Sequence, residues 1–475
     1  MESLEDGLEE RRRYVRIRDA LAQRIAGGEW RAHDKLPSVR QLAAQYEVNR
    51  LTAYKACRLL QTDGWIYAKE KSGYYVSGDE PAPESAAAPP DAPEGLRVSG
   101  RLRNEMFDIQ GIPVAYQFSQ ALIDPNLLPN LYMSEYVKRV FDLYPKLIGT
   151  YATAQGDEEL REALAGRMSA DMRDDLRRDD LLITTGAQQA IDLISRTFLR
   201  SRDAILIERP TYSAAIAIFR HQGVRMLPVD IRPDGYDLAQ VEALMRVHRP
   251  RLFYMNPTFH NPTGYTVPTA QRKRLVELAE RYRCLLVEDD AFREMYFEEP
   301  PPPPLFAYDT EGWVVYLRSY SKYVAPGLRI CAVAGHRTAI APLVTAKSLA
   351  DNGTPLVNQK IFLHYLLSER MRQHVEKLRT ALQIRRDIME EELCATGWQW
   401  TTPRGGLNLW LRTNEDLEVE ALLRESLRQS LSFVPGAICD PFGGSASHIR
   451  LSYAFANESL VREGVRRLAA IARTI

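Results

Sequence analysis

A lysine that can act as a nucleophile stands at position 322, at the end of Ser319-Tyr320-Ser321-Lys322. Asp289 and Asn261 precede it and Arg329 follows it, all at or near the ends of predicted strands. A lysine amine condenses with a carbonyl group to form a Schiff base, and the neighbours add a carboxylate, an amide and a guanidinium. This set suits a carbonyl compound that also carries a ring nitrogen and a phosphate.

Pyridoxal 5′-phosphate (PLP) is such a compound, and a protein that binds it must hold each of these groups. Lys322 would form the Schiff base as the catalytic residue, while Asp289 would keep the pyridine nitrogen protonated. Asn261 would hydrogen-bond the phenolic oxygen, and Tyr212 would stack on the ring. The other candidate contacts are the N–H groups of Ala187 and Gln188 at a helix start, Arg329 for the phosphate, Ser319 and Ser321. A single lysine or Asn-Pro turn would carry no such meaning, but their joint order predicts PLP as the cofactor.

Strands and helices alternate from about residue 105, which predicts an α/β fold with a mostly parallel sheet. Strands are expected at Leu181–Thr184, Ala204–Glu208, Arg251–Asn256, Cys284–Asp289, Trp313–Arg318 and Ile330–Ala334. Helices between them include Ala187–Leu199 and Ala270–Tyr282. A small C-terminal α+β part is expected from about residue 365, with strands near Leu407–Leu411 and Ile449–Tyr453. The proline run Pro300–Pro304 is interpreted as a rigid surface loop.

Residues 11–78 predict a separate winged helix-turn-helix domain. An apolar stripe favours a first helix over 14–26, a capping box at Ser38 and Gln41 starts the second, and Asn49 caps the third, which ends near Thr62. Two short strands, Trp65–Ala68 and Tyr74–Val76, would form the hairpin wing. The candidate DNA contacts are Arg40, Asn49, Arg50, Thr52, Tyr54, Lys55, Lys71, Ser72 and Gly73.

The distribution of charge supports this division, although the net charge of the whole chain is zero. Residues 11–78 hold 14 basic and 6 acidic side chains, and the rest of the chain holds 48 and 56. A basic segment attached to a mildly acidic remainder indicates that the basic segment binds phosphate groups. Residues 79–104, rich in proline, alanine and acidic residues near their start, are interpreted as a linker, and residues 105–475 as the PLP-binding domain.

The remaining composition excludes several classes of protein. No stretch of about 18 apolar residues is present to span a membrane, and the acidic N-terminus does not resemble a secretion signal. The 5 cysteines are scattered, without a CxxC or Cys/His cluster. We therefore expect a cytoplasmic protein without disulfides or a metal site.

Both halves resemble known families. "KLPSVRQLA", "VNRLTAYKACRLLQTDGW" and "KSGYYV" have the order and spacing of the GntR-type DNA-binding domain. Residues 105–475 resemble the fold-type I aminotransferases, closest to the 2-aminoadipate/kynurenine subgroup. This resemblance implies a large α/β/α domain with a small C-terminal domain. The combination is similar to the MocR regulators, in which such a head is fused to such a body.

The resemblance implies two more site residues and shows one departure. Tyr151 in "YATAQG" would reach the phosphate of the partner's site in a dimer, and Arg450 in "HIRLSYA" would clamp a substrate α-carboxylate. The family usually has a tyrosine three residues after the aspartate, where it donates to the cofactor's phenolic oxygen. Here that position holds Phe292, so catalysis is expected to be slower than in a dedicated enzyme.

The implied function is a cytoplasmic, PLP-dependent transcription regulator that forms a homodimer with exchanged DNA-binding heads. It would bind double-stranded promoter DNA and respond to an amino acid, an amine or PLP through an aldimine site at Lys322. The alternative is an active aminotransferase that carries the winged helix as a DNA-binding or assembly module. A third interpretation, a DNA-binding protein with an empty body, is disfavoured because each major cofactor contact is present. Passage of the amino group to a keto acid would separate the first two.

Overall fold

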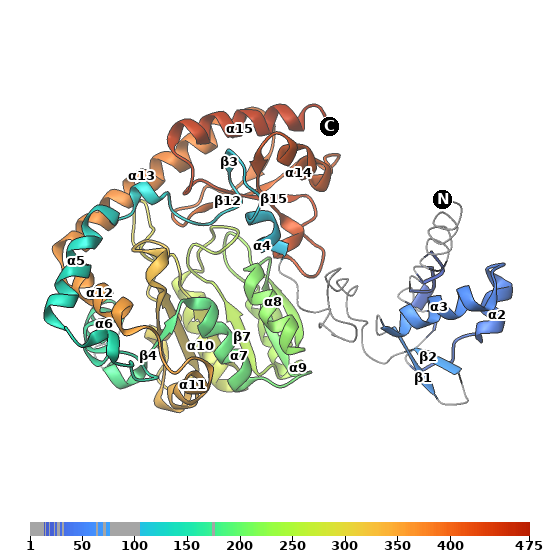
Figure 1. Ribbon diagram of the computed structural model, residues 1–475, viewed down its shortest axis with the longest axis horizontal. Helices are drawn as coiled ribbons and strands as arrows, with labels where there is room; N and C mark the ends of the chain where they lie inside the picture. Colours follow the sequence, from blue (N-terminus) through green and yellow to red (C-terminus); the bar gives the residue numbers. More distant parts are fainter. Residues whose placement is uncertain are drawn as a thin grey trace. The chain divides into compact units, whose positions relative to one another are not determined.

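The computed structural model describes residues 33–62, 65–69, 73–76, 105–172 and 176–475, together with parts of 14–30. The chain forms two compact units, residues 1–103, here called the head, and residues 104–475, called the body (Figure 1). Each unit has a hydrophobic core of its own. The predicted linker, and Lys71 and Ser72 of the predicted wing, lie outside the described residues.

The head has the predicted helix-turn-helix and hairpin. Its described residues between 14 and 25 are helical, and α2 (Val39–Gln45), α3 (Arg50–Thr62), β1 (Ile66–Lys69) and β2 (Gly73–Val76) follow. The predicted capping box is present, because the Gln41 N–H donates to Ser38 Oγ at 3.3 Å and the Ser38 N–H donates to Gln41 Oε1 at 2.9 Å. The Thr52 N–H donates to Asn49 Oδ1 at 2.7 Å, as expected of an N-cap. The core consists mainly of Leu21, Leu42, Ala53, Ala56, Cys57 and Leu60.

Among the described residues of the body, seven strands form the large sheet. In spatial order they are β4 (Leu181–Thr185), β10 (Ile330–Ala334), β9 (Val314–Ser319), β8 (Leu285–Asp289), β7 (Leu252–Met255), β5 (Ala204–Arg209) and β6 (Arg225–Asp230). Only β10 runs antiparallel to its neighbours, so the expectation of a mostly parallel sheet is confirmed. Each of the six predicted strands is present, with ends within two residues of the prediction.

Helices cover both faces of the large sheet, because its strands bury side chains on alternate sides. On one face α7 (Ala187–Phe198), α8 (Ser213–Gln222) and α11 (Arg337–Ala350) share a core with Leu182, Ile207 and Tyr254. On the other, α6 (Glu158–Asp171), α9 (Leu238–His248), α10 (Thr269–Tyr282) and α12 (Leu356–Leu366) belong to a core that includes Ile183, Leu206 and Phe253. This is a three-layer α/β/α arrangement (Figure 1).

A second, antiparallel sheet forms the C-terminal part of the body. Its order is β11 (Gln399–Trp400), β12 (Asn408–Arg412), β15 (His448–Ser452) and β14 (Val434–Pro435). The long helix α13 (Glu369–Leu393), with α14 (Val419–Arg428) and α15 (Glu458–Ala472), packs around it (Figure 1).

The first segment of the body joins this C-terminal part. Strand β3 (Tyr116–Gln117) pairs in parallel with β13 (Leu431–Ser432), and α4 (Glu105–Gln110) precedes it. Helix α5 (Asn130–Leu143) then leads back to the large domain, where it contacts α12. The small domain is therefore built from both ends of the body. No helix in the described ranges is long and apolar enough to cross a membrane.

The proline run Pro300–Pro304, which was predicted as a rigid surface loop, is hydrogen-bonded to the body by two arginine side chains. Arg293 Nη1 donates to the carbonyl of Pro302 at 3.0 Å, and Arg272 Nη1 donates to that of Pro303 at 3.3 Å. Pro304 is buried. The loop lies partly inside the body because two arginines satisfy its carbonyl groups.

Candidate functional site

A cavity of about 270 Å³ lies at the C-terminal ends of β8 and β9, where ligands of open α/β sheets bind. It brings together most of the residues predicted from the sequence: Lys322, Asp289, Asn261, Tyr212, Ala187, Gln188, Ser319, Ser321, Arg329 and Arg450. Phe292 also lines it. Tyr151 does not, and its side chain is 86% exposed.

Lys322 lies in a turn after β9, with its amine inside the cavity. Its Nζ donates to the carbonyl of Ala121 at 2.9 Å. Burial, followed by the positive charges of Arg450 and Arg329, lowers the pKa of Lys322 to about 8. A substantial fraction of this amine is therefore neutral near physiological pH, as a nucleophile requires.

Asp289 ends β8 and presents one carboxylate oxygen without a partner. The Tyr254 hydroxyl donates to Oδ2 at 2.8 Å, whereas Oδ1 is buried and accepts no hydrogen bond from the described residues. Burial raises the pKa of Asp289 to about 7. A protonated ring nitrogen would satisfy Oδ1 and favour the ionised carboxylate, so the residue fits a pyridine N–H.

Hydrogen-bond donors gather where α7 begins. Gly186 precedes the helix with a φ of 83°, and no side chain caps the helix. A Cβ at this position would overlap the Arg329 guanidinium, which donates to the Thr185 carbonyl at 3.3 Å. The Ser321 hydroxyl is buried and has no hydrogen-bond partner among the described residues. Uncapped N–H groups, a guanidinium and an unused hydroxyl form a cradle suited to a phosphate.

Arg450, on β15, is 2% exposed and has no carboxylate partner among the described residues. Its Nη1 donates to Asn261 Oδ1 at 3.1 Å and its Nη2 to the Ser119 carbonyl at 2.5 Å, while its Nε is buried without a partner. Burial lowers the pKa of Arg450. A buried guanidinium that is not balanced by a carboxylate is suited to an anionic ligand.

Asn256 is a supporting residue that the sequence reasoning missed. Its Oδ1 accepts from the Asn261 N–H at 2.8 Å, and its Nδ2 donates to the Asp289 carbonyl. Its own N–H donates to Glu208 Oε2 at 2.7 Å. Asn256 thus holds the Asn261 turn against the end of β8. The sequence signal that could have identified Asn256 is its position directly after β7, the strand next to β8.

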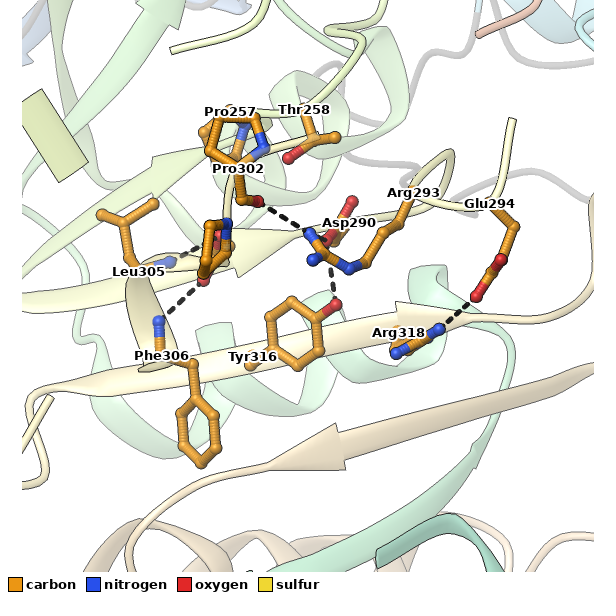
Figure 2. Close-up of polar contacts among 12 residues, drawn as sticks. Pro257, Thr258, Asp290, Arg293, Glu294, Pro302, Leu305, Phe306, Tyr316 and Arg318 are labelled. Atoms are coloured by element: carbon orange, nitrogen blue, oxygen red, sulfur yellow. Dashed lines mark hydrogen bonds and ion pairs between the residues drawn. The ribbon is translucent and has the colours of Figure 1, made fainter. Parts of the chain in front are cut away.

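The loop that carries Phe292 is fixed by buried ionic contacts (Figure 2). The Tyr316 hydroxyl donates to Asp290 Oδ2 at 2.8 Å, and Arg293 Nη1 lies 3.6 Å from the same oxygen. Two residues after Phe292, Glu294 accepts from Arg318 on β9, as Figure 2 shows, and from Arg379 on α13 at 2.9 Å. The loop is therefore held on both sides of Phe292, which is 2% exposed.

Changing Phe292 to tyrosine would place a hydroxyl donor in the cavity wall. We expect the pH midpoint of the bound cofactor's visible absorbance to fall, because the hydroxyl competes for the phenolic oxygen that holds the neighbouring proton. Absorbance titrations of wild type, Phe292→Tyr and Phe292→Leu measure this, the leucine variant being a control without a donor. An unchanged midpoint in Phe292→Tyr would show that position 292 does not face that oxygen.

In the head, most of the described candidate DNA contacts are accessible. Arg40, Asn49, Arg50 and Tyr54 are exposed, Lys55 is half-buried, and Gly73 begins β2 with a φ of 116°. The prediction that Thr52 contacts DNA is wrong, because Thr52 is 2% exposed and its hydroxyl donates to Asn49 Oδ1 at 2.9 Å. It lies four residues before the core residue Ala56 and so shares that buried helix face.

Comparison with known proteins agrees with both units. Residues 142–468 match the family described as aminotransferase class I and II, and residues 13–76 match the bacterial regulatory proteins of the gntR family. The 2-aminoadipate transaminase of Thermus thermophilus is 35% identical over 78% of this chain and 94% of its own. The uncharacterized HTH-type transcriptional regulator YisV of Bacillus subtilis (strain 168) is 30% identical over 97% of this chain and 96% of its own.

Among solved structures, the chain is similar to LysN, the α-aminoadipate aminotransferase of Thermus thermophilus, complexed with N-(5′-phosphopyridoxyl)-L-leucine. The TM-score is 0.73 and the identity 34%, covering 79% of this chain and 96% of that one. The body is thus a fold-type I, class I and II aminotransferase domain, with PLP as its cofactor. With its gntR-type head, the chain belongs to the MocR-type fusions of these two domains.

Proposed function

We propose that this protein is a transcription regulator that binds promoter DNA through its head and senses an α-amino acid in the Lys322 cavity. The observation that carries the proposal is that one chain combines helix α3, which exposes Arg50 and Tyr54, with a buried lysine whose cavity also contains a carboxylate, an amide, a guanidinium and an aromatic ring. Effector binding would change DNA affinity only by favouring one of two states of the protein.

Each cavity residue has a defined part in this proposal. PLP, when bound, supplies an aldehyde that captures amines and a ring that withdraws electrons. Lys322 would present a neutral amine at the carbonyl carbon, and Asp289 Oδ1 would accept a hydrogen bond from the protonated ring nitrogen. Asn261 would donate to the phenolic oxygen, and Tyr212, at the start of α8, would supply the aromatic face for the ring. The N–H groups of Ala187 and Gln188, with Arg329, Ser319 and Ser321, would hold the phosphate.

Arg450 selects the effector's carboxylate. Its guanidinium is already oriented by Asn261 and the Ser119 carbonyl, so little side-chain entropy is lost when an α-carboxylate binds. A plain amine would leave this buried charge unbalanced. The effector proposed here is therefore an amino acid rather than a simple amine.

Dimerisation is part of the proposal, supported by exposed apolar side chains on α5 and the segment after it. Leu143 is 54%, Ile148 78% and Tyr151 86% exposed, which is unusual for large apolar residues that lie close together in sequence. A second copy of the chain would cover them. In such a homodimer, with heads exchanged between subunits, Tyr151 would reach the partner's phosphate. We place this regulator in the cytoplasm.

Binding to promoter DNA should depend on the exposed face of α3. Replacing Arg50 with alanine should weaken binding by about 1–3 kcal/mol and relax specificity, since a base contact in the major groove is lost. Affinity should also fall steeply with salt. Fluorescence anisotropy with the native promoter measures both. The control is Arg24→Ala, whose guanidinium is paired with Glu29, and equal binding by wild type and Arg50→Ala would remove this residue from the interface.

The second candidate function is a working aminotransferase that carries a DNA-binding module. It is favoured by the lowered pKa of Lys322 together with Arg450. The test follows the absorbance of the PLP-loaded protein with an amino acid, then with a keto acid. A regulator changes spectrum once and forms little new amino acid, whereas an enzyme converts many equivalents of keto acid.

A further inference from the structure

Each charged side chain that is described in the lining of the Lys322 cavity already has a partner under the proposed function, so none is available to pair with an effector's side chain. Among the described residues that line it, the charged ones are Lys322, Arg329, Arg450 and Asp289. Under the proposed function, Lys322 meets the carbonyl carbon and Arg329 the phosphate. Arg450 meets the α-carboxylate, and Asp289 meets the ring nitrogen. A second charged group on the effector would therefore find no unassigned partner of opposite charge among these described residues.

Part of the cavity lining is apolar. Helix α4 contributes Met106 and Phe107, and the lining also includes Leu122 and Phe292. Met106 is 8% exposed, and its sulfur lies 4.0 Å from Arg450 Nη2, so the apolar wall adjoins the site of the α-carboxylate. An amino acid held by Arg450 places its side chain within reach of a thioether, an aliphatic chain and two aromatic rings.

Gln110 is the polar residue that α4 adds to this wall. Its Nε2 donates at 3.2 Å to the Ser119 carbonyl, the same oxygen that accepts from Arg450 Nη2. The amide is therefore tied to the support of Arg450. A neutral amide with one donor already used compensates poorly for the desolvation of a buried carboxylate.

We propose that the effector of this regulator is an α-amino acid with a large uncharged apolar side chain, aromatic or aliphatic. The inference rests on the proposed function, because it assigns a class of ligand to the same site. An acidic or a basic side chain would lose hydration against the buried Met106 and would find no unassigned opposite charge among the described lining residues. An amine without a carboxylate leaves Arg450 unbalanced.

The first test is an absorbance titration of the PLP-loaded full-length protein with matched ligands. Leucine and aspartate are similar in size and differ in charge, while phenylalanine and phenethylamine differ in the carboxylate. Half-saturation should need at least about tenfold less leucine than aspartate, and at least about tenfold less phenylalanine than phenethylamine. Equal or tighter binding of aspartate would overturn the inference and leave the proposed function standing. A spectrum that no amino acid changes would overturn both.

A charge placed on the α4 wall gives a second, independent readout. Phe107 is 71% exposed, so Phe107→Arg should fold normally. It should reduce the leucine-over-aspartate preference by about tenfold, since it supplies the missing cation. Phe107→Gln controls for loss of the ring, and Val247→Arg controls for an added charge at an exposed residue outside the cavity. An unchanged preference in Phe107→Arg would show that the effector's side chain does not contact α4.

Discussion

Replacing Lys322 with alanine is expected to abolish the yellow absorbance of the purified protein. In the wild type, borohydride should attach the cofactor covalently to the peptide that contains Lys322, and in the variant no peptide should carry it. The reason is that only a neutral amine beside the bound phosphate can condense with the cofactor's carbonyl. Visible absorbance and peptide mass spectrometry measure the two effects.

The matched control is Lys347→Ala, because Lys347 is another buried lysine of the body and is paired with Asp351 at 2.7 Å. It should keep the colour. The rate at which the cofactor-free wild type takes up PLP should also rise between pH 7 and 9, since the pKa of Lys322 is about 8 and the amine loses its proton over this range. A wild type that stays colourless with added PLP would contradict the cofactor assignment for this chain.

The second large effect concerns stability rather than chemistry. Arg272 is fully buried on α10, and its guanidinium lies 3.5 Å from Glu288, the residue before Asp289. Its other partners are the carbonyls of Pro257, Val267 and Pro303 and the hydroxyl of Thr258. Removing one partner of a buried pair leaves groups unsatisfied in a low-dielectric interior, so Arg272→Ala should destabilise the body by about 3–5 kcal/mol.

Urea unfolding followed by tryptophan fluorescence measures this effect. Arg274→Ala, on the same helix, is the control, because Arg274 pairs with Glu277 and Glu242 at the surface and exposed ion pairs contribute little. Equal unfolding midpoints for the two variants would show that the Arg272 contacts do not stabilise the body. Arg272→Ala should also lose PLP binding as the body unfolds. The carbonyl of Pro257 accepts a hydrogen bond from Arg272, and Pro257 lies in the loop that carries Asn261.

The fold was largely predictable because its strands are buried and strongly apolar. Strand β6 was not among the predicted strands. It contains Pro228, and a residue without an N–H is tolerated there because β6 lies at the edge of the sheet. The pairing of β3 with β13 was also missed. Each is two residues long and they are far apart in the sequence, so no local pattern indicates their contact.

The residues of the candidate site could be predicted from the sequence, but the hydrogen bonds that hold them in place could not. Lys322, Asp289 and Asn261 stand in motifs whose order points to PLP. The contacts of Tyr254 with Asp289 and of Ala121 with Lys322 depend on tertiary packing, which no spacing reveals. Thr52 was misplaced because the sequence suggested a polar contact, whereas the helical period turns it toward the core.

The most direct test of the central claim is the affinity of PLP-loaded protein for its promoter, with and without a saturating apolar amino acid. Anisotropy with labelled promoter DNA should show at least about a fivefold change in Kd on adding leucine or phenylalanine, a coupling of about 1 kcal/mol. Aspartate at the same concentration should have little effect, and Lys322→Ala should bind DNA without responding. An identical Kd for the wild type with and without every amino acid that changes its spectrum would contradict the claim that this cavity regulates DNA binding.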